Sequence, residues 1–346
     1  MKVSLFARAL RFSITLFATA LLCNGFAFTA YGDDVVKLRF AALSPAGGYI
    51  YSQHLQPFAD AVEKASNGRL IIDLQPVGTY GRPAQAFELV EAGVIDMAWT
   101  IQGYTPGRFR QSEVLELPFM FDDAETGSAV FWRMYQEGLF GRDYGSVIPL
   151  ALYLHRPYGI FTTEQPLRTL EDFTGLKIRA PGALTGRAFE MLGATPIGLQ
   201  ATEMAEGVRL GTINAVAFPW EAIKLYGMDG LFNTLTDAKI SSPRFIVLMN
   251  KRRFEKLPKD LQNVIRQHSG YELSRAIGAG VDKMELQTKQ AYLNDPKTLV
   301  LELGGDERRR IEARIAPLIT EWLQGDKRNT SAERKRLLKR AQKALK

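Results

Sequence analysis

The chain has 346 residues, one cysteine and a formal net charge of +7. The positive charge lies at the two ends: residues 1–32 carry three basic and no acidic side chains, and residues 326–346 carry a net charge of +7, which leaves about −3 for the body. Nucleic-acid binding requires a basic face on the folded domain, so this distribution argues against that class. The single cysteine, Cys23, excludes an internal disulfide framework.

Residues 1–32 have the pattern of a secretory signal peptide. Basic residues precede the apolar run Phe12–Leu22, and small residues follow it. The run is too short to cross a bilayer comfortably, and an uncleaved anchor is the alternative. Leu22 is too bulky for the usual lipoprotein cleavage site before Cys23. We therefore expect an exported, periplasmic protein that keeps enough residues after cleavage for two lobes.

In the first half of the body, strand and helix patterns alternate. The βαβαβ order indicates an α/β fold with a doubly wound parallel sheet. The small-residue loop that contains Ser44 leads into a helix, so its backbone N–H groups can face an anion, although most such loops only turn the chain. The expected elements are strands at 36–41, 70–74 and 94–100, helices at 51–65 and 82–92, and a helix that Asp123 caps and that ends at Tyr135.

A second βαβ series follows the first. Strands are expected at 147–154, 176–180 and 213–218, and a later strand at 245–250 returns the chain to the first lobe. The stretch from Asp260 to Leu293 is predicted to form one unusually long helix, which glycines such as Gly270 bend. A helix of this length is expected to run across both lobes.

One candidate binding residue lies in the segment Gly175–Gly182. Apolar residues alternate there with Lys177 and Arg179, which indicates a strand, and Pro181 ends it. Arg179 is therefore placed at the C-terminal end of the strand, where open α/β sheets bind ligands. Its guanidinium can hold a carboxylate through two parallel hydrogen bonds, a geometry that lysine lacks. A surface ion pair is the common alternative for such an arginine.

The sequence contains no recognisable catalytic or metal site. Its three histidines are far apart, and no metal-ligand spacing appears. It has no Gly-x-Ser-x-Gly elbow, phosphate loop or dinucleotide fingerprint. We expect no enzymatic activity, no cofactor and no metal. A carboxylate-based enzyme is an unsupported alternative, because acidic residues such as Glu221 follow predicted strands.

The basic C-terminal tail, residues 326–346, contains apolar residues at roughly helical spacing, including Leu337 and Ala341. A solvated, frayed helix is the expected structure. The alternatives are an amphipathic helix that lies on an anionic membrane surface or docks on a partner.

Several segments in this order resemble the DctP-type substrate-binding proteins of tripartite ATP-independent periplasmic (TRAP) transporters. They are Gly107–Phe109 ahead of Glu116–Phe119, Leu170–Asp172 ahead of the Arg179 segment, and the late strand 247–250. The similarity covers about residues 36–293 and is most specific around Arg179. It implies an α/β, two-lobed periplasmic-binding-protein-like fold with a ligand cleft between the lobes and a long lobe-spanning helix.

The resemblance also implies domain limits, partners and one site residue. Lobe I would comprise residues 33–156 plus about 245–288, and lobe II residues 157–244 plus about 289–325. The implied partners are a small-molecule carboxylate and the small and large TRAP membrane subunits, which move the ligand with a sodium gradient. In this family the arginine of the motif binds the ligand carboxylate, and Arg179 matches that arginine.

The sequence departs from the sialic-acid-binding members of the family. Their second arginine falls here near Gly159, and some of their polar contacts fall on Gly182, Ala201 and Phe218. We therefore expect a more apolar pocket and a monocarboxylate with an apolar or aromatic body, because sugar hydroxyls would lack hydrogen-bond partners there. Besides Arg179, the expected ligand contacts are Trp220, Phe218, Tyr104, Trp99, Thr100, Gln102 and Ser44.

Two alternatives to these expectations stay open. For each aromatic residue, packing in the core is the alternative to ligand contact. For the whole protein, the alternative is an exported enzyme or a sensor accessory protein that acts on a small carboxylate, because one fold can serve several functions.

Overall fold

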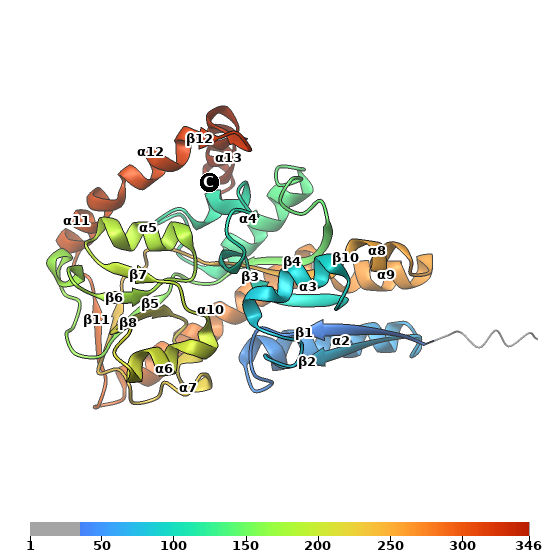
Figure 1. Cartoon of the computed structure of the whole chain (residues 1–346), viewed down its shortest axis with the longest axis horizontal. Coiled ribbons are helices and arrows are strands. Elements are labelled where there is room, and N and C mark those ends of the chain that lie inside the picture. Colours follow the sequence, from blue (N-terminus) through green and yellow to red (C-terminus); the bar gives the residue numbers. More distant parts are fainter. Residues whose placement is uncertain (1–34, 346) are drawn as a thin grey trace, which may run out of the picture. The chain divides into compact units, whose positions relative to one another are not determined.

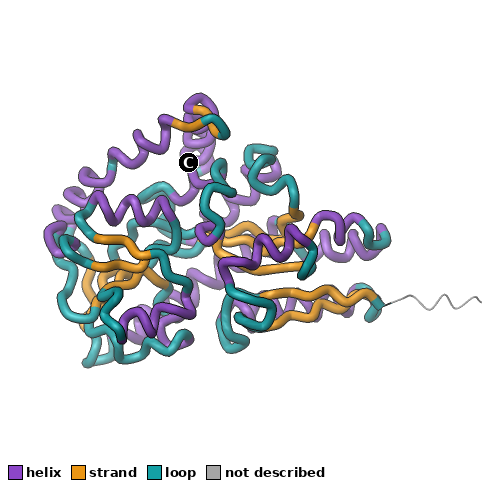
Figure 2. Tube along the Cα trace, viewed as in Figure 1, coloured by secondary structure: helices purple, strands orange, loops and turns teal. Residues whose placement is uncertain are grey.

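Two β-sheets organise the part of the chain that the structure, a computed structural model, describes, which is residues 35–345 (Figures 1 and 2). The predicted signal peptide and Cys23 lie outside the described residues. From Val36 onward the chain forms one compact unit. We call the five-stranded sheet with its helices lobe I and the six-stranded sheet with its helices lobe II. Among the described helices, none combines the length and the apolar character needed to cross a bilayer.

The sheet of lobe I has the strand order β2-β1-β3-β10-β4. The first three strands are parallel, as the βαβαβ pattern predicts, but β10 runs antiparallel to both β3 and β4. Alternation along β1 buries Leu38 and Phe40 against the helices on one face. The strands are β1 Val36–Ala41, β2 Leu70–Gln75, β3 Met97–Ile101, β4 Val147–Leu154 and β10 Arg244–Asn250.

The sheet of lobe II has the strand order β11-β9-β5-β8-β6-β7. The chain first enters lobe II after β4 and returns before β10, so this pair of connections lies at neighbouring strands of lobe I. It crosses again along α10 (Tyr271–Leu293) to β11 and returns to lobe I at α13 (Ser331–Ala344). β5, β9 and β11 were not predicted. Each has four residues and shows little periodicity, whereas β6 and β8 lie within the longer predicted segments 176–180 and 213–218. The strands are β5 Gly159–Thr162, β6 Lys177–Arg179, β7 Thr195–Ile197, β8 Ala215–Phe218, β9 Thr234–Asp237 and β11 Leu299–Glu302.

Helices pack on both faces of each sheet and form four apolar clusters with the strands (Figure 1). The α-helices are α2 Gln56–Ala65, α3 Ala86–Ala92, α4 Ala124–Gln136, α5 Ala183–Met191, α6 Met204–Arg209, α7 Ala222–Leu225, α8 Lys251–Glu255, α9 Lys259–His268, α10 Tyr271–Leu293, α11 Gly305–Ile315, α12 Pro317–Gln324 and α13 Ser331–Ala344. Shorter elements are the π-helix η1 Tyr51–Leu55, the 3₁₀ helices η2 Pro83–Gln85, η3 Gln102–Tyr104, η4 Ser112–Glu116, η5 Leu170–Phe173 and η6 Ala201–Glu203, and the hairpin strands β12 Gly325–Asp326 and β13 Asn329–Thr330.

The predicted long helix is present but divided. α9 ends at His268, and α10 begins after Gly270, whose φ of +92° lies in the region that favours glycine. α10 packs against α4 and β4 in lobe I and reaches β11 in lobe II. Gly278 permits the close approach to α4, since a Cβ there would lie 2.6 Å from the Ala124 carbonyl oxygen. The helix thus spans both lobes.

The basic tail is not a frayed helix. α13 buries Leu337 and Ala341 in the apolar cluster that also contains residues of α4. Thr330 and Glu333 form a capping box at its N-terminus. Arg334 pairs with Asp326 at 2.7 Å, and this arginine is largely buried. The predicted helix is confirmed, whereas its predicted solvation is wrong, because lobe I supplies an apolar surface for it.

Candidate functional site

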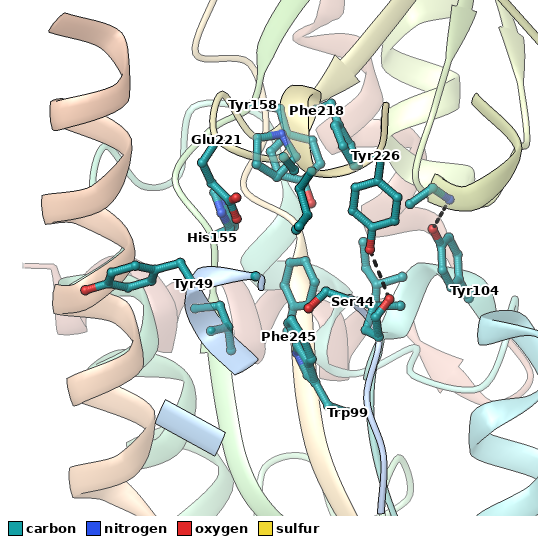
Figure 3. Close-up of a pocket in the computed structure, with 18 of the residues that line it drawn as sticks. Ser44, Tyr49, Trp99, Tyr104, His155, Tyr158, Phe218, Glu221, Tyr226 and Phe245 are labelled. Carbon is teal, nitrogen blue, oxygen red and sulfur yellow. Dashed lines mark hydrogen bonds between the residues drawn. The ribbon is translucent and has the colours of Figure 1, made fainter. Parts of the chain in front are cut away.

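A cavity lies between the two lobes, close to the C-terminal ends of β3, β4, β6 and β8 (Figure 3). The space open to the centre of a water molecule is about 50 Å³, several times the roughly 10–15 Å³ that one enclosed water needs. The cavity therefore has room for a small, compact molecule. Lobe I contributes Ser44, Tyr49, Trp99, Tyr104, Tyr153 and Phe245, and lobe II contributes Arg179, Ala201, Phe218, Glu221 and Tyr226.

Arg179 is almost fully buried, with 1% of its surface exposed. Its Nε donates to the Leu199 carbonyl oxygen (3.0 Å), its Nη1 to the Ala217 carbonyl oxygen (3.2 Å) and its Nη2 to the Tyr104 hydroxyl (3.0 Å). The guanidinium carbon lies 5.4 Å from the centre of the Phe218 ring. Within the described chain no acidic side chain pairs with Arg179. A guanidinium has five N–H groups, so two of them stay available to a ligand.

The local sequence explains the position of this arginine. β6 pairs in parallel with β7 and β8, and Ile178 is fully buried in lobe II. Lys177 at the start of the strand is exposed, whereas Arg179 at its end is buried. The predicted strand end is therefore the place where lobe I covers lobe II, which turns a surface position into a buried one.

Tyr104 connects the two lobes at the buried arginine. Its hydroxyl accepts hydrogen bonds from Arg179 Nη2 (3.0 Å) and from the backbone N–H of Ala201 (3.1 Å). Both donors belong to lobe II, while Tyr104 belongs to lobe I. A second contact between the lobes is made by Tyr226, whose hydroxyl donates to the Leu43 carbonyl oxygen at 3.0 Å. Both contacts depend on the lobes being closed on each other.

Aromatic rings form most of the remaining wall. Tyr153 and Phe245 stack with ring centres 5.0 Å apart and an interplanar angle of 11°. The Trp99 indole N–H donates to the Tyr153 hydroxyl at 2.7 Å, which fixes both rings. On the opposite lobe, Phe218 packs edge to face with Tyr226. Such rings offer apolar surfaces to a flat ligand body.

Five of the predicted ligand contacts line the cavity, namely Arg179, Phe218, Tyr104, Trp99 and Ser44. Ser44 is in the loop that precedes η1, and its hydroxyl donates to the Pro45 carbonyl oxygen at 3.0 Å. The expected role of this loop, to face an anion with its backbone N–H groups, stays a prediction.

Thr100 and Gln102 do not line the cavity. Successive strand residues face opposite sides, so Trp99 and Ile101 border the cavity while Thr100 is buried on the other face of β3. The Gln102 side chain belongs to a separate buried network, where it accepts a hydrogen bond from Arg244 Nη1 at 2.7 Å. Gln102 therefore fixes the end of β3 from behind the cavity.

Trp220 also lies outside the cavity, although it follows the strand that carries Phe218. Its ring packs against Phe161 and Tyr292. It also covers Gly159, where a Cβ would come within 2.8 Å of the Trp220 Nε1. Trp220 therefore leaves no room for a side chain at residue 159, near which the second arginine of the sialic-acid-binding members was expected to fall. Its contribution to the site is indirect.

Sequence reasoning did not identify the polar residues at the side of the cavity away from Tyr104, which are Glu221 and His155 (Figure 3). Burial raises the pKa of Glu221 to about 7. Burial lowers the pKa of His155 to about 3, and the charge of Arg156 adds to this effect, so the imidazole is neutral at physiological pH. The available signal was the position of Glu221 close to the C-terminal end of β8, two residues after Pro219.

Burial likewise raises the pKa of Glu285, on α10, to about 8. This carboxyl group is 3% exposed and accepts a hydrogen bond from the backbone N–H of Trp220 at 3.1 Å. The backbone N–H of Glu221 approaches the second oxygen at 3.5 Å. α10 therefore holds the backbone that presents Glu221 to the cavity.

The chain matches one protein family over most of its length. Residues 42–325 match the family model described as bacterial extracellular solute-binding protein, family 7, also called DctP. The match begins after β1 and ends at the β12 hairpin, so it covers both lobes and the cavity.

Solved structures resemble the whole described fold. A TRAP solute binding protein from Rhodoferax ferrireducens T118, in complex with copurified benzoate, is 28% identical, with a TM-score of 0.85 over 90% of this chain and 98% of that one. A marine metagenome TRAP solute binding protein from an unidentified microbe, specific for aromatic acid ligands and in complex with metahydroxyphenylacetate, is 28% identical, with a TM-score of 0.84 over 90% and 98%. One from Bordetella bronchiseptica with bound (R)-mandelate and (S)-mandelate is 25% identical, with a TM-score of 0.81 over the same shares. These matches confirm the predicted two-lobed α/β fold.

Proposed function

The chain belongs to family 7 of the bacterial extracellular solute-binding proteins, the DctP family, and we propose that it is a periplasmic receptor for an aromatic monocarboxylate. The family and the similar structures are TRAP solute-binding receptors rather than enzymes. The proposal assigns the ligand carboxylate to Arg179 and the ligand body to the aromatic wall of the cavity.

The observation that carries this proposal is the buried guanidinium of Arg179. A buried charge is costly unless an opposite charge or hydrogen bonds compensate it. Neutral oxygens of Leu199, Ala217 and Tyr104 accept three of its N–H groups, and among residues 35–345 no carboxylate pairs with it. A bound carboxylate would supply the missing negative charge through the two remaining N–H groups, one on each Nη atom.

The rest of the cavity favours a flat, apolar body on that carboxylate. Trp99, Tyr153 and Phe245 from lobe I face Phe218 and Tyr226 from lobe II, and the space between them is small. A sugar acid would bring several hydroxyl groups to a wall with few partners for them. Benzoate, metahydroxyphenylacetate and mandelate, which the similar proteins bind, are all small aromatic monocarboxylates.

Binding is proposed to close the two lobes. The hydroxyls of Tyr104 and Tyr226 bond across the interface to Arg179 and Leu43, and these contacts would form when the lobes meet around the ligand. The closed receptor would then deliver its ligand to the small and large membrane subunits of a sodium-coupled TRAP permease. Uptake of the ligand into vesicles that contain those subunits, with and without a sodium gradient, tests this last step.

A ligand panel measured by calorimetry and thermal shift tests the receptor function. The panel contains benzoate, mandelate and 3-hydroxyphenylacetate, with glucuronate and malate as sugar and dicarboxylic acids. We expect the aromatic acids to bind and to raise the melting temperature of the purified protein, since a ligand at a hundredfold excess over its Kd adds about 2.7 kcal/mol of stability. Arg179→Ala is expected to abolish this effect.

Arg252→Ala is the matched control, because Arg252 is an exposed arginine on α8, outside the cavity. It should bind the aromatic acids as the wild type does. Equal binding of the aromatic acids by wild type and Arg179→Ala would overturn the assigned role of Arg179. Binding of glucuronate or malate in preference to every aromatic acid would overturn the ligand class.

A further inference from the structure

The cavity has a second polar end besides Arg179. Glu221 and His155 lie on one side of the cavity in Figure 3, and Tyr104, which is bonded to Arg179, lies on the other side. Tyr226 lies within electrostatic reach of both ends. Burial is the main cause of the raised pKa of its phenol, Tyr104 and Glu221 raise this pKa further, and the charge of Arg179 lowers it. Glu221 and Arg179 therefore flank the same apolar space.

The carboxyl group of Glu221 has no partner in this arrangement. Its backbone N–H faces Glu285, but no described residue donates a hydrogen bond to its side-chain oxygens or pairs with them. The imidazole of His155 is engaged only at Nδ1, which lies 3.3 Å from the Arg156 carbonyl oxygen. Partly buried polar groups that border a cavity and have no partner are available to a ligand.

We propose that Glu221, assisted by His155, recognises a hydroxyl group on the aromatic ring of the ligand, at the end away from the carboxylate. This inference rests on the proposed function, because it takes the carboxylate to be held by Arg179. It narrows the ligand class from aromatic monocarboxylates to hydroxylated ones.

The chemistry of the two residues fits a phenolic hydroxyl. A hydroxyl has one proton to donate. It can donate this proton to a carboxylate oxygen of Glu221, or to Nε2 of the neutral His155 imidazole, whose Nδ1–H faces the Arg156 carbonyl oxygen. An unsubstituted ring offers no donor and leaves the Glu221 carboxyl without a partner, which costs binding free energy. A second carboxylate on the ligand would instead meet the acidic end of the cavity and be disfavoured.

The test compares benzoate with 3-hydroxybenzoate and 4-hydroxybenzoate by calorimetry on the full purified protein. For the wild type we expect at least one hydroxybenzoate to bind roughly tenfold or more tightly than benzoate, the ratio that a hydrogen bond to a charged group supplies. Glu221→Leu should reduce this ratio to about one through loss of the hydroxybenzoate affinity, while its benzoate affinity stays the same or rises. Glu221→Gln, which keeps an oxygen acceptor, should retain part of the ratio.

Glu206→Gln is the control variant, because Glu206 is an exposed residue of α6 outside the cavity. It should keep the wild-type ratio. The inference is overturned if the ratio of hydroxybenzoate to benzoate affinity is near one in the wild type, or if it is the same in the wild type and Glu221→Leu. In either case, benzoate binding that depends on Arg179 would still support the receptor function. Failure of all three acids to bind overturns the inference, and the proposed function is overturned with it if mandelate and 3-hydroxyphenylacetate fail to bind as well. Melting temperatures of the variants without ligand separate a binding effect from misfolding.

Discussion

The hydroxyl of Tyr104 connects the two lobes at the buried Arg179. It accepts hydrogen bonds from Arg179 and from the Ala201 N–H group, so Tyr104→Phe would leave two buried donors without an acceptor. Each such loss costs about 1–3 kcal/mol, and the cost falls on the closed state alone. We expect the affinity for an aromatic acid that binds the wild type to fall at least about tenfold, as measured by calorimetry.

Tyr49→Phe is the control for this prediction. Tyr49 also lines the cavity, but within the described chain its hydroxyl forms no hydrogen bond, so its removal should change the affinity little. Equal losses in the two variants would show that the hydroxyl of Tyr104 has no special part in closure.

A second residue-scale prediction concerns the pH dependence of stability. Because burial raises the pKa of Glu285 to about 8, the folded protein keeps a proton that the unfolded chain releases near pH 4–5. The free energy of unfolding should therefore fall as the pH rises from about 5 to about 8, by at most about 1.4 kcal/mol per pH unit for this group. Glu285→Gln should remove this contribution, so the variant gains stability relative to the wild type as the pH rises.

Urea denaturation at several pH values between 5 and 8.5 measures this difference. The neighbouring groups are Glu221, whose pKa burial also raises, and Arg156, whose charge favours the ionised form of Glu285. Both are present in wild type and variant, so the difference reports Glu285. Glu88→Gln, an exposed substitution on α3, should parallel the wild type, and a parallel curve for Glu285→Gln would refute the prediction.

Only some residues of the candidate site could be predicted from their local sequence. Arg179 could be placed from its own segment, because a short strand that ends at a proline fixes where the side chain emerges. Thr100 was placed on the cavity side although strand alternation puts it behind Trp99. Glu221 and Tyr226 meet the residues of lobe I only in the folded chain, and no local pattern encodes that meeting.

At the scale of elements, α13 provides a prediction about packing. Leu337 is 1% exposed in the apolar cluster of lobe I, and removing a buried leucine side chain to alanine costs about 2–5 kcal/mol. We expect Leu337→Ala to lower the free energy of unfolding by about 2–5 kcal/mol. Urea denaturation, followed by fluorescence or circular dichroism, measures this change.

Leu345→Ala is a matched control on the same stretch of chain, because Leu345 is 38% exposed. It should change the free energy of unfolding by less than about 0.5 kcal/mol. If both substitutions have equally small effects, α13 does not pack on lobe I in solution, and the solvated tail would be the better description.

The helices and strands were largely predictable from the sequence, whereas the surfaces on which they pack were not. Periodicity predicted a helix within the tail, where the structure has α13, and it predicted the strand Val147–Leu154, which the structure has with the same limits. The break between α9 and α10 follows from Gly270, whose positive φ ends the regular helix. The surface that covers α13 comes from α4, almost two hundred residues earlier in the chain, and helical spacing alone carries no information about it.

At the scale of the whole molecule, the resemblance to a known family predicted the two-lobed fold better than composition did. The parallel βαβαβ series accounts for three of the five strands of the sheet in lobe I. The antiparallel placement of β10 between β3 and β4 depends on where the chain returns from lobe II, which only the complete path decides. This return brings Phe245 into the cavity wall and Arg244 into the buried network behind it.

Closure of the lobes on a ligand leads to the last prediction. Residues 35–345 contain no cysteine, so spin labels can be attached to introduced cysteines alone. Val94 in lobe I and Leu210 in lobe II are 53% and 70% exposed, and neither lines the cavity. Because Tyr104 and Tyr226 hold the lobes together only when closed, we expect the label-to-label distance in Val94→Cys/Leu210→Cys to be broadly distributed without ligand. An aromatic acid that binds the protein should narrow it to a single population.

Electron–electron double resonance measures this distribution directly. Adding Arg179→Ala to the labelled pair should leave the distance distribution broad at the same ligand concentration. Without Arg179 the ligand carboxylate has no partner, so the ligand no longer binds the closed state more tightly than the open state. A distribution that is already narrow without ligand, and unchanged by it, would mean that the closed arrangement is the resting state. In that case the ligand must enter through local opening of the cavity wall, and the buried charge of Arg179 must be tolerated without a counter-ion.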